Sequence, residues 1–175
     1  QMCIRDSYAS GTYTPIDPTS VGKSEFFKSH ESEKWAVIAD TRGTLVWPET
    51  DDKNRLCLVS ELAPREYLDY LKKNGISYIA VGKKSIDLKE AVRILETEFG
   101  SKRIGVVGGG HINGSFLEAG LIDEVSMVYG AGIDGRSSQP TAFEGIPESH
   151  TVPYKLTLQS VEKVADQSVW IRYTV

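Results

Sequence analysis

Residues 104–114 read Ile-Gly-Val-Val-Gly-Gly-Gly-His-Ile-Asn-Gly, an apolar run that leads into three consecutive glycines. This pattern predicts a buried strand over 104–107, a tight turn, and a helix that begins near His111 or Ile112 and ends at Gly120. Glycine allows positive φ angles and close approach to a ligand, and the free N–H groups at the start of a helix favour an anion. The expected ligand is therefore a phosphate or pyrophosphate. Tight packing of strand against helix is the alternative explanation for the glycines.

The turn differs from two common phosphate-binding motifs. No Gly-Lys-Ser/Thr follows, as a Walker loop requires, and Asn113 stands where the GxGxxG motif has its last glycine. The identity of the ligand therefore rests on other parts of the chain.

Short apolar runs at 35–39, 56–59 and 78–81 predict three further buried strands. Helical spacing lies between them, over 62–74 and 87–100, and Asp87 followed by Glu90 resembles a capping box. Strands that alternate with helices indicate βαβ units and a mostly parallel sheet covered on both faces. The predicted fold class is thus α/β.

The two ends of the chain have a different character. Residues 8–32 are rich in Gly, Thr, Ser and Pro, which predicts a long surface loop with a short turn near Phe26 and Phe27. After a strand over 125–129 and a loop over 130–153, alternating residues predict an antiparallel hairpin that turns at 165–167. We therefore expect the open parallel sheet to finish in antiparallel edge strands.

The composition excludes several classes of protein. A chain of 175 residues suffices for one domain, and a net charge of −4 argues against a dedicated nucleic-acid binder. No apolar stretch is long enough to span a membrane, which makes a cytoplasmic protein the expectation. Cys3 and Cys57 lie far apart without matching histidines, so we expect neither a disulfide nor a metal site, and Cys57 is predicted to lie in the core.

Asp40-Thr41-Arg42 follows a predicted strand, at the end where ligands bind in open α/β sheets. Thr41 can donate to a phosphate, and Arg42 can grip a 2′-phosphate with two hydrogen bonds, which favours NADP over NAD. A solvated turn is the alternative. Val81 and Gly82 stand at the end of the predicted strand over 78–81. They either face a nucleotide ring or lie in the core.

The histidines indicate no catalytic base. His111 stands at a helix N-terminus, which disfavours imidazolium, so a backbone contact to the ligand is its expected role. His30 and His150 lie in polar loops and are expected to be exposed. No Ser-His-Asp or Cys-His arrangement is present, and the sequence assigns no catalytic residue.

Four segments together resemble a known family. They are VVGGGHINGSFLEAGLIDE (106–124), IADTRGTL (38–45), AVGKKSIDLKEAV (80–92) and VWIRYTV (169–175). The first is similar to the C-terminal reductase domain of the bifunctional riboflavin-biosynthesis protein, the RibD C-terminal domain family. The other three look like that family's cofactor-side strands, helix and last strand. The resemblance extends over nearly everything from residue 35 onward.

The resemblance implies a dihydrofolate-reductase-like fold, a three-layer αβα arrangement, and an NADPH-dependent reductase of 5-amino-6-(5-phosphoribosylamino)uracil that delivers hydride to the ribose C1′. A homodimer is also implied. The cofactor residues that it implies fall into two sets. Thr41, Arg42, Val81 and Gly82 would lie along the adenosine half, and the phosphates would meet Gly108, Gly109, Gly110, His111, Ile112 and Asn113.

One departure from the family pattern concerns the start of the chain. Family members begin with a strand and helix that carry a Ser-Leu/Val-Asp-Gly motif, which this sequence lacks. Residues 1–7 resemble translated adapter sequence, so we expect residues 8–175 to be a reductase domain without its first strand and helix, inactive by itself. Two alternatives remain: a reductase of the same fold that acts on a pterin or another small molecule, and a module that binds NADP without turnover.

Overall fold

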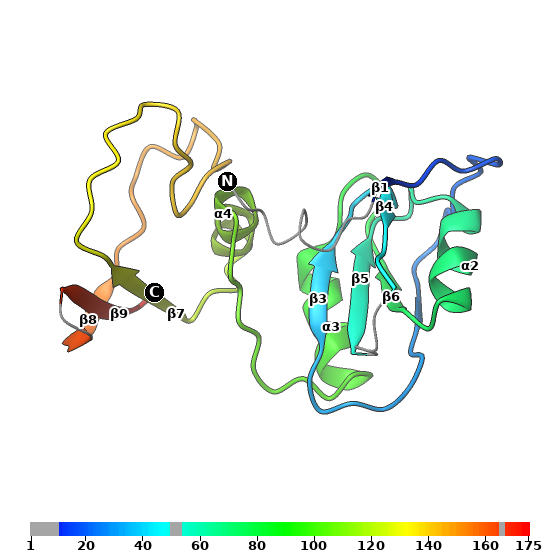
Figure 1. Cartoon of the computed structure of the whole chain (residues 1–175), viewed down its shortest axis with the longest axis horizontal. Coiled ribbons are helices and arrows are strands. Elements are labelled where there is room, and N and C mark those ends of the chain that lie inside the picture. The colour runs from blue at the N-terminus through cyan, green and yellow to red at the C-terminus, as the bar shows by residue number, and fades with distance from the viewer. Residues whose placement is uncertain (1–10, 50–53, 165–166) are drawn as a thin grey trace. The chain divides into compact units, whose positions relative to one another are not determined.

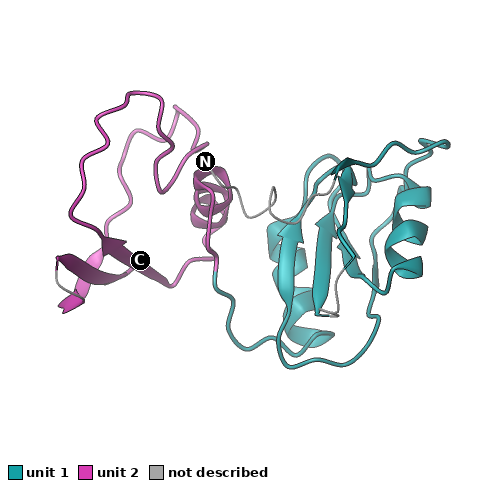
Figure 2. Ribbon diagram, viewed as in Figure 1, with its two compact units in different colours: residues 1–105 teal, residues 106–175 magenta. Residues whose placement is uncertain are grey.

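The computed structural model describes residues 11–49, 54–164 and 167–175. The predictions for residues 1–7 and for positions 165 and 166 of the hairpin turn lie outside these ranges. The chain divides into two compact units, residues 1–105 (unit 1) and residues 106–175 (unit 2), shown in teal and magenta in Figure 2. Each unit is described by itself.

Unit 1 contains a four-stranded sheet in the order β2 (Glu25–Phe27), β6 (Ser77–Ala80), β5 (Arg55–Val59) and β3 (Ala36–Ala39) (Figure 1). The last three strands are parallel, whereas β2 pairs antiparallel with β6. Two further short strands, β1 (Gly11–Thr12) and β4 (Leu45–Val46), pair with each other. The predicted parallel strands are therefore confirmed at 36–39, 55–59 and 77–80.

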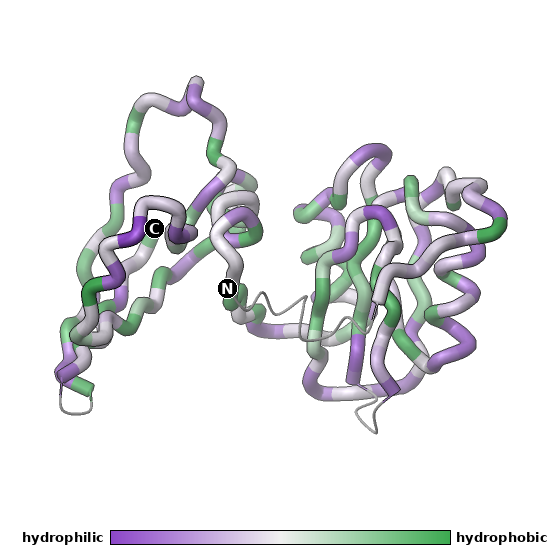
Figure 3. The backbone as a smooth tube through the Cα atoms, turned by 45° about the horizontal axis from the view of Figure 1, so that its top comes forward, coloured by the Kyte–Doolittle hydropathy of each residue, from purple (hydrophilic) through white to green (hydrophobic). Residues whose placement is uncertain are grey.

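Two helices lie on opposite faces of this sheet, because successive residues of β5 and β6 point to alternate sides. Helix α2 (Arg65–Lys73) packs on one face and α3 (Leu88–Thr97) on the other. Apolar segments, green in Figure 3, follow the strands between them. The α2 side of the core includes Cys57, Val59, Tyr67, Leu68, Leu71, Tyr78 and Ala80, and the α3 side includes Leu56, Leu58, Ile79, Val81, Ala91, Ile94, Leu95 and Phe99.

The helix ends follow the expected capping rules. The Asp87 carboxylate accepts the Glu90 N–H at 3.1 Å, which confirms the predicted N-cap of α3. Helix α2 begins after Pro64 and ends at Asn74, followed by Gly75 with φ 66°. Leu62 was expected on the buried face of this helix, but it lies before the helix and is 46% exposed.

Strand β2 falls where the sequence predicts only loop. A bidentate ion pair anchors it: Arg65 Nη1 and Nη2 donate to Glu25 Oε1 and Oε2 at 2.7 and 2.9 Å. The Tyr78 hydroxyl also donates to Glu25 Oε1, at 2.7 Å. These partners lie 40 and 53 residues away in sequence, so a local pattern does not reveal them. The arginine lowers the pKa of Glu25 to about 2.

His30 is also held by contacts distant in sequence, and the expectation that it is exposed is wrong. Its ring nitrogens lie 2.9 Å from Ser29 Oγ and 3.0 Å from Asn54 Oδ1. The ring also packs on Trp35, with centroids 5.1 Å apart. The histidine thus ties the segment after β2 to the start of β5. His150 is exposed as expected and stacks on Tyr154.

Unit 2 contains helix α4 (Gly110–Glu118) and an antiparallel sheet in the order β7 (Glu124–Tyr129), β9 (Ser168–Thr174) and β8 (Thr157–Val164). The predicted strand near 125–129 and the C-terminal hairpin are confirmed. Register places apolar side chains together on one face of this sheet: Val125, Met127, Tyr129, Leu158, Val161, Val169, Ile171 and Tyr173.

The predicted strand over 104–107 is absent, because these residues have no strand assignment and no described strand pairs with them. A strand needs a neighbour to satisfy its backbone N–H and C=O groups, and apolar character alone does not supply one. Ile104 is 36% exposed and Val107 is 77% exposed. The sequence predicts that the parallel sheet continues into the C-terminal antiparallel strands, but in the described residues β7, β8 and β9 form a sheet of their own.

The Glu25 ion pair gives unit 1 a pH-dependent stability. A carboxyl whose pKa is lowered from 4.5 to about 2 stabilises the folded state above pH 4.5, and this contribution is lost as the pH falls toward 2. We expect Glu25→Gln to lower the free energy of unfolding by about 1–2 kcal/mol at neutral pH, after allowance for solvent screening. Chemical denaturation at several pH values measures this difference.

Tyr78→Phe is the control, because it removes a hydroxyl bonded to the same carboxylate and leaves the charge in place. The difference between Glu25→Gln and the unmodified chain should shrink as the pH falls toward 2, whereas the phenylalanine variant should keep the acid dependence. A difference that stays constant from pH 7 to pH 2 contradicts the assignment.

Candidate cofactor site

The turn that follows β3 is organised by the carboxylate of Asp40, which is 4% exposed. Its Oδ2 accepts the backbone N–H groups of Thr44 and Leu45 at 2.6 and 2.8 Å, and its Oδ1 accepts the Thr44 hydroxyl at 3.0 Å. The Tyr67 hydroxyl, from helix α2, donates to Oδ2 at 3.0 Å. Asp40 is thus fully engaged in shaping the turn, which argues against a role as an acid or base.

Gly43 lets this turn lie directly against Tyr67. Its φ is 71°, and a Cβ atom there would lie 2.5 Å from Tyr67 Cδ1. The Tyr67 hydroxyl accepts the indole N–H of Trp47 at 3.0 Å, and burial raises the pKa of this tyrosine. The aromatic ring and the carboxylate together determine the path of the chain from 40 to 47.

Ser60 holds the same turn from the end of β5. Its backbone N–H and its hydroxyl both donate to the carbonyl oxygen of Thr41, at 3.0 and 2.7 Å. Thr41 is half-buried and Arg42, next to it, is exposed. No hydrogen bond or ion pair is found for the Arg42 side chain among the described residues. The turn therefore presents a guanidinium group at the carboxyl end of β3.

Val81 and Gly82 follow β6 at the same end of the parallel strands. The Val81 side chain is fully buried in the α3 side of the core, as the second of its two predicted alternatives requires. Its backbone N–H donates to the Val59 carbonyl oxygen. Gly82 has φ 92°, and a Cβ atom there would lie 2.1 Å from the Ser85 carbonyl oxygen. Glycine at 82 is thus required by the close turn into α3, and its carbonyl accepts the Glu61 N–H at 2.8 Å.

The glycine-rich turn precedes α4 in unit 2. Gly108 has φ 103°, in the left-handed region that favours glycine, and the Gly108–Gly109 peptide is cis. A Cβ atom on Gly109 would meet nothing within 4 Å, and one on Gly108 would meet only the Asn113 amide, at 3.7 Å. These two residues therefore leave space beside the backbone at the start of the helix, as a bound phosphate requires.

Gly110 and Gly114 have a different role, because the segment 141–145 packs on them. A Cβ atom on Gly110 would lie 2.5 Å from the Thr141 carbonyl oxygen, and one on Gly114 would lie 2.0 Å from that of Glu144. The Glu144 N–H donates to the Gly110 carbonyl at 2.9 Å. The motif thus divides into two open glycines and two packing glycines. Packing explains Gly110 and Gly114, and phosphate binding stays a prediction for Gly108 and Gly109.

His111, Ile112 and Asn113 form the first turn of α4. The Asn113 side-chain amide donates to the Ala142 carbonyl oxygen at 2.7 Å, which anchors the same packing segment. His111 is exposed, and its Nε2 lies 3.5 Å from Glu144 Oε2. Ile112 is half-buried, and its N–H donates to the Gly109 carbonyl oxygen.

The predicted cofactor residues thus fall into two groups. Thr41, Arg42 and Gly82 come together in unit 1, at the carboxyl ends of the parallel strands, while residues 108–113 share the start of α4 in unit 2. The described residues contain no cluster of three or more His, Cys, Asp or Glu side chains suited to a metal ion.

Two residues beside the predicted cofactor residues are not indicated by the sequence motifs. Ser60 immediately follows a strand, as Asp40 does, and that shared position is the signal that points to it. Glu144 lies in a loop rich in Gly, Ser and Pro, and only the folded chain reveals its contact with the helix. Chemically, the two groups offer backbone amides and a guanidinium for phosphates, with no nucleophile among the groups identified.

Comparison with known protein families identifies the family of this chain. The sequence profile of the RibD C-terminal domain matches residues 9–170. The chain belongs to the RibD C-terminal domain family. This membership agrees with the resemblance found in the sequence.

Curated proteins that are similar to this RibD C-terminal domain chain are named as pyrimidinone phosphate reductases or as RibD. The 2,5-diamino-6-ribosylamino-4(3H)-pyrimidinone 5′-phosphate reductase of Archaeoglobus fulgidus is 27% identical over 66% of this chain and 50% of its own length. The Aquifex aeolicus protein of the same name is 29% identical over 55% of this chain and 42% of its own length. The riboflavin biosynthesis protein RibD of Chlamydia trachomatis is 25% identical over 63% of this chain and 30% of its own length. This chain spans half or less of these relatives.

Solved structures support the fold. A pyrimidine reductase-like protein of Corynebacterium diphtheriae has a TM-score of 0.64 and 16% identity, over 79% of this chain and 59% of that one. RibD of Acinetobacter baumannii has a TM-score of 0.59 and 22% identity, over 79% of this chain and 36% of that one. At these identities the likeness concerns the fold, and it agrees with the predicted α/β class.

The division of the glycine motif is tested by two substitutions. Gly114→Ala should lower the free energy of unfolding by about 1–3 kcal/mol, because its methyl group collides with the backbone of Glu144. Gly109→Ala should change it by less than about 1 kcal/mol, because the position is open and its φ of −59° suits alanine. Thermal and denaturant unfolding measure both. Equal losses in the two variants contradict the division.

Proposed function

We propose that this chain binds NADPH and serves a reductase of riboflavin biosynthesis that acts on a phosphorylated ribosylaminopyrimidine. The observation that carries the proposal is the family match over residues 9–170. Two features of the chain support it: in unit 1 an exposed arginine follows β3, and in unit 2 open glycines precede helix α4. When bound, NADPH supplies a hydride, and the proposed acceptor is C1′ of the ring-opened ribose.

The proposed cofactor contacts use the two groups of residues described above. Thr41, Arg42 and the backbone at Val81 and Gly82 would bind the adenosine half. The residues that would bind the phosphates are Gly108, Gly109, Gly110, His111, Ile112 and Asn113. The preference for NADPH over NADH is assigned to Arg42, because a guanidinium pairs with a phosphate through two hydrogen bonds and finds no such partner on an unmodified ribose.

Catalysis in this proposal depends on position. Hydride transfer between a nicotinamide and a carbon atom needs contact and alignment, which can supply a large part of the rate without a nucleophile. Asp40 is excluded as the proton donor, because its oxygens already accept four hydrogen bonds within the turn. We therefore assign the chain's residues to binding and orientation and none to covalent chemistry.

The substrate of this proposal is 5-amino-6-(5-phosphoribosylamino)uracil. A second candidate is the 2,5-diamino pyrimidinone phosphate, because the Archaeoglobus and Aquifex relatives are named for its reduction. The two differ at ring position 2, which carries an oxygen in the uracil and an amino group in the pyrimidinone. A binding site that forms a hydrogen bond to the group at position 2 of one substrate leaves a polar group unpaired when the other substrate binds, and so discriminates against it.

The oligomeric state and the cellular location are also part of the proposal. We propose a homodimer in the cytoplasm. The exposed apolar side chains on one face of the unit 2 sheet, Tyr129, Leu158 and Val161, support association, because they are 53%, 54% and 57% exposed. No helix in the described part of the chain is long and apolar enough to cross a membrane.

Turnover tests the proposed function. The chain and the product of the complete reading frame are each mixed with NADPH and with either pyrimidine or a pterin, and the absorbance of the reduced nicotinamide is followed. We expect both to bind NADPH and the complete product to oxidise it with one of the pyrimidines.

Three outcomes count against parts of this account. Turnover by the chain alone would contradict its expected inactivity. NADPH binding without turnover by either protein would favour the module that binds NADP without catalysis. Turnover with a pterin but neither pyrimidine would favour the other reductase.

Arg42→Ala tests the cofactor assignment. Loss of the guanidinium should weaken NADPH binding about tenfold and leave NADH binding within about twofold, because only NADPH carries the 2′-phosphate. Isothermal titration with both cofactors measures the two affinities. Unchanged NADPH affinity in a folded variant overturns the assignment of Arg42.

A further inference from the structure

Three parallel strands of unit 1 end side by side, and their following loops are bonded together. The turn after β5 supplies two consecutive backbone amides: Ser60 N–H donates to the Thr41 carbonyl at 3.0 Å, and Glu61 N–H donates to the Gly82 carbonyl at 2.8 Å. The loops after β3 and β6 are therefore fixed on either side of the β5 end. Arg42 and Lys83 are the residues that come next in these two loops.

The spacing of the strands brings these two cations within reach of one anion. Neighbouring strands lie about 4.8 Å apart, so the ends of β3 and β6 are separated by about 10 Å across β5. Extended arginine and lysine side chains each reach about 6 Å from the backbone. A phosphate above the end of β5 can therefore contact both head groups.

The loop that carries Lys83 has a restricted backbone. Gly82 adopts φ 92°, and the loop folds back so closely that a Cβ atom at Gly82 would lie 2.1 Å from the Ser85 carbonyl oxygen. The Asp87 N–H donates to the Val81 carbonyl at 3.2 Å and closes the loop. Lys83 thus projects from a defined point, and only its side chain has to be ordered by a ligand.

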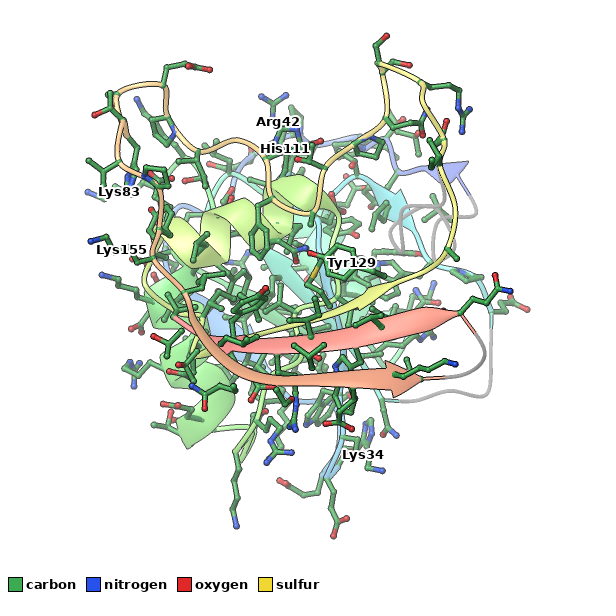
Figure 4. The ribbon with its side chains drawn as sticks, turned by 90° about the vertical axis from the view of Figure 1, so that its left-hand side faces the viewer. Lys34, Arg42, Lys83, His111, Tyr129 and Lys155 are labelled. Atoms are coloured by element: carbon green, nitrogen blue, oxygen red, sulfur yellow. The ribbon has the colours of Figure 1, made fainter. Side chains whose placement is uncertain are left out.

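Three exposed cations at this end of the sheet are available to an anion. Arg42, Lys83 and Lys84 are all exposed, and none has an ion pair among the described residues. Of the nearby acids, Asp40 is buried within its turn, Asp87 caps α3, and Glu61 accepts the Ser24 hydroxyl at 2.8 Å. Lys34 is an exposed lysine just before β3, at the opposite end of that strand. Figure 4 shows Arg42 and Lys83 toward the top and Lys34 toward the bottom.

We propose that Lys83 is a second determinant of cofactor specificity, binding the 2′-phosphate of NADPH together with Arg42. This inference rests on the proposed function, because it assumes that the adenosine half lies at the carboxyl ends of β3, β5 and β6. It adds a residue from a different strand, and it explains why a lysine follows the glycine that closes the loop. Arg42 supplies the bidentate contact and Lys83 a point charge from the other side of β5.

The experiment measures the affinity of the chain for four ligands: NADPH, NADH, 2′,5′-ADP and AMP. Because 2′,5′-ADP and AMP both lack the nicotinamide and differ by the 2′-phosphate, they measure the contribution of that phosphate alone. Lys83→Ala should weaken NADPH and 2′,5′-ADP about fivefold to tenfold and leave NADH and AMP within about twofold. Lys34→Ala is the matched control, because it removes one exposed lysine from the same unit and should leave all four affinities unchanged. Circular dichroism and thermal unfolding establish that each variant is folded.

Two further variants sharpen the result. Lys83→Arg should retain most of the affinity for 2′,5′-ADP, because the charge is kept. Arg42→Ala combined with Lys83→Ala should remove the preference for 2′,5′-ADP over AMP. If Lys83→Ala and Lys34→Ala give the same affinities, the inference is overturned while the proposed function stands. If the unmodified chain binds neither NADPH nor NADH, the proposed function itself fails.

Discussion

The hydrogen bonds of the Asp40 carboxylate hold together the turn of unit 1 that we assign to the adenosine half of the cofactor. They join the turn after β3 to helix α2 through Tyr67, and the close contact of Gly43 with the tyrosine ring depends on the same arrangement. Thr41, fastened to Ser60, then carries Arg42 at the end of the sheet. A buried carboxylate with four donors is costly to disturb, so this turn is a rigid support for the residue that we propose binds the cofactor.

Much of unit 1 could be predicted from local pattern. The apolar runs became β3, β5 and β6. Strands β5 and β6 are buried on both faces, whereas the edge strand β3 buries Ile38 and leaves Val37 exposed. Asp87 caps α3, as the spacing of Asp87 and Glu90 indicates. Family membership could also be predicted, because the glycine turn and the Asp-Thr-Arg turn occur together. The position of Arg42 at the carboxyl end of a parallel strand followed from the apolar run before it, and ligands bind at that end of such sheets.

Other features depend on contacts that local pattern does not contain. Strand β2 pairs with β6, and Glu25 contacts Arg65 and Tyr78, all of them distant in sequence. Residues 104–107 have the composition of a strand, yet no described strand pairs with them, so hydrophobicity alone misled the prediction. The different roles of Gly109 and Gly114 become visible only once Glu144 packs against α4. Long-range pairing and packing decided each of these.

The central claim is that two separate segments of unit 1, residues 41–42 and residues 82–83, bind one NADPH molecule. Amide hydrogen exchange with and without NADPH tests this most directly, because it reports on both segments in one experiment. The account predicts slower exchange in both segments when NADPH is present, with residues 32–34 at the opposite end of β3 unchanged. Slower exchange in one segment only, or in neither, would contradict it.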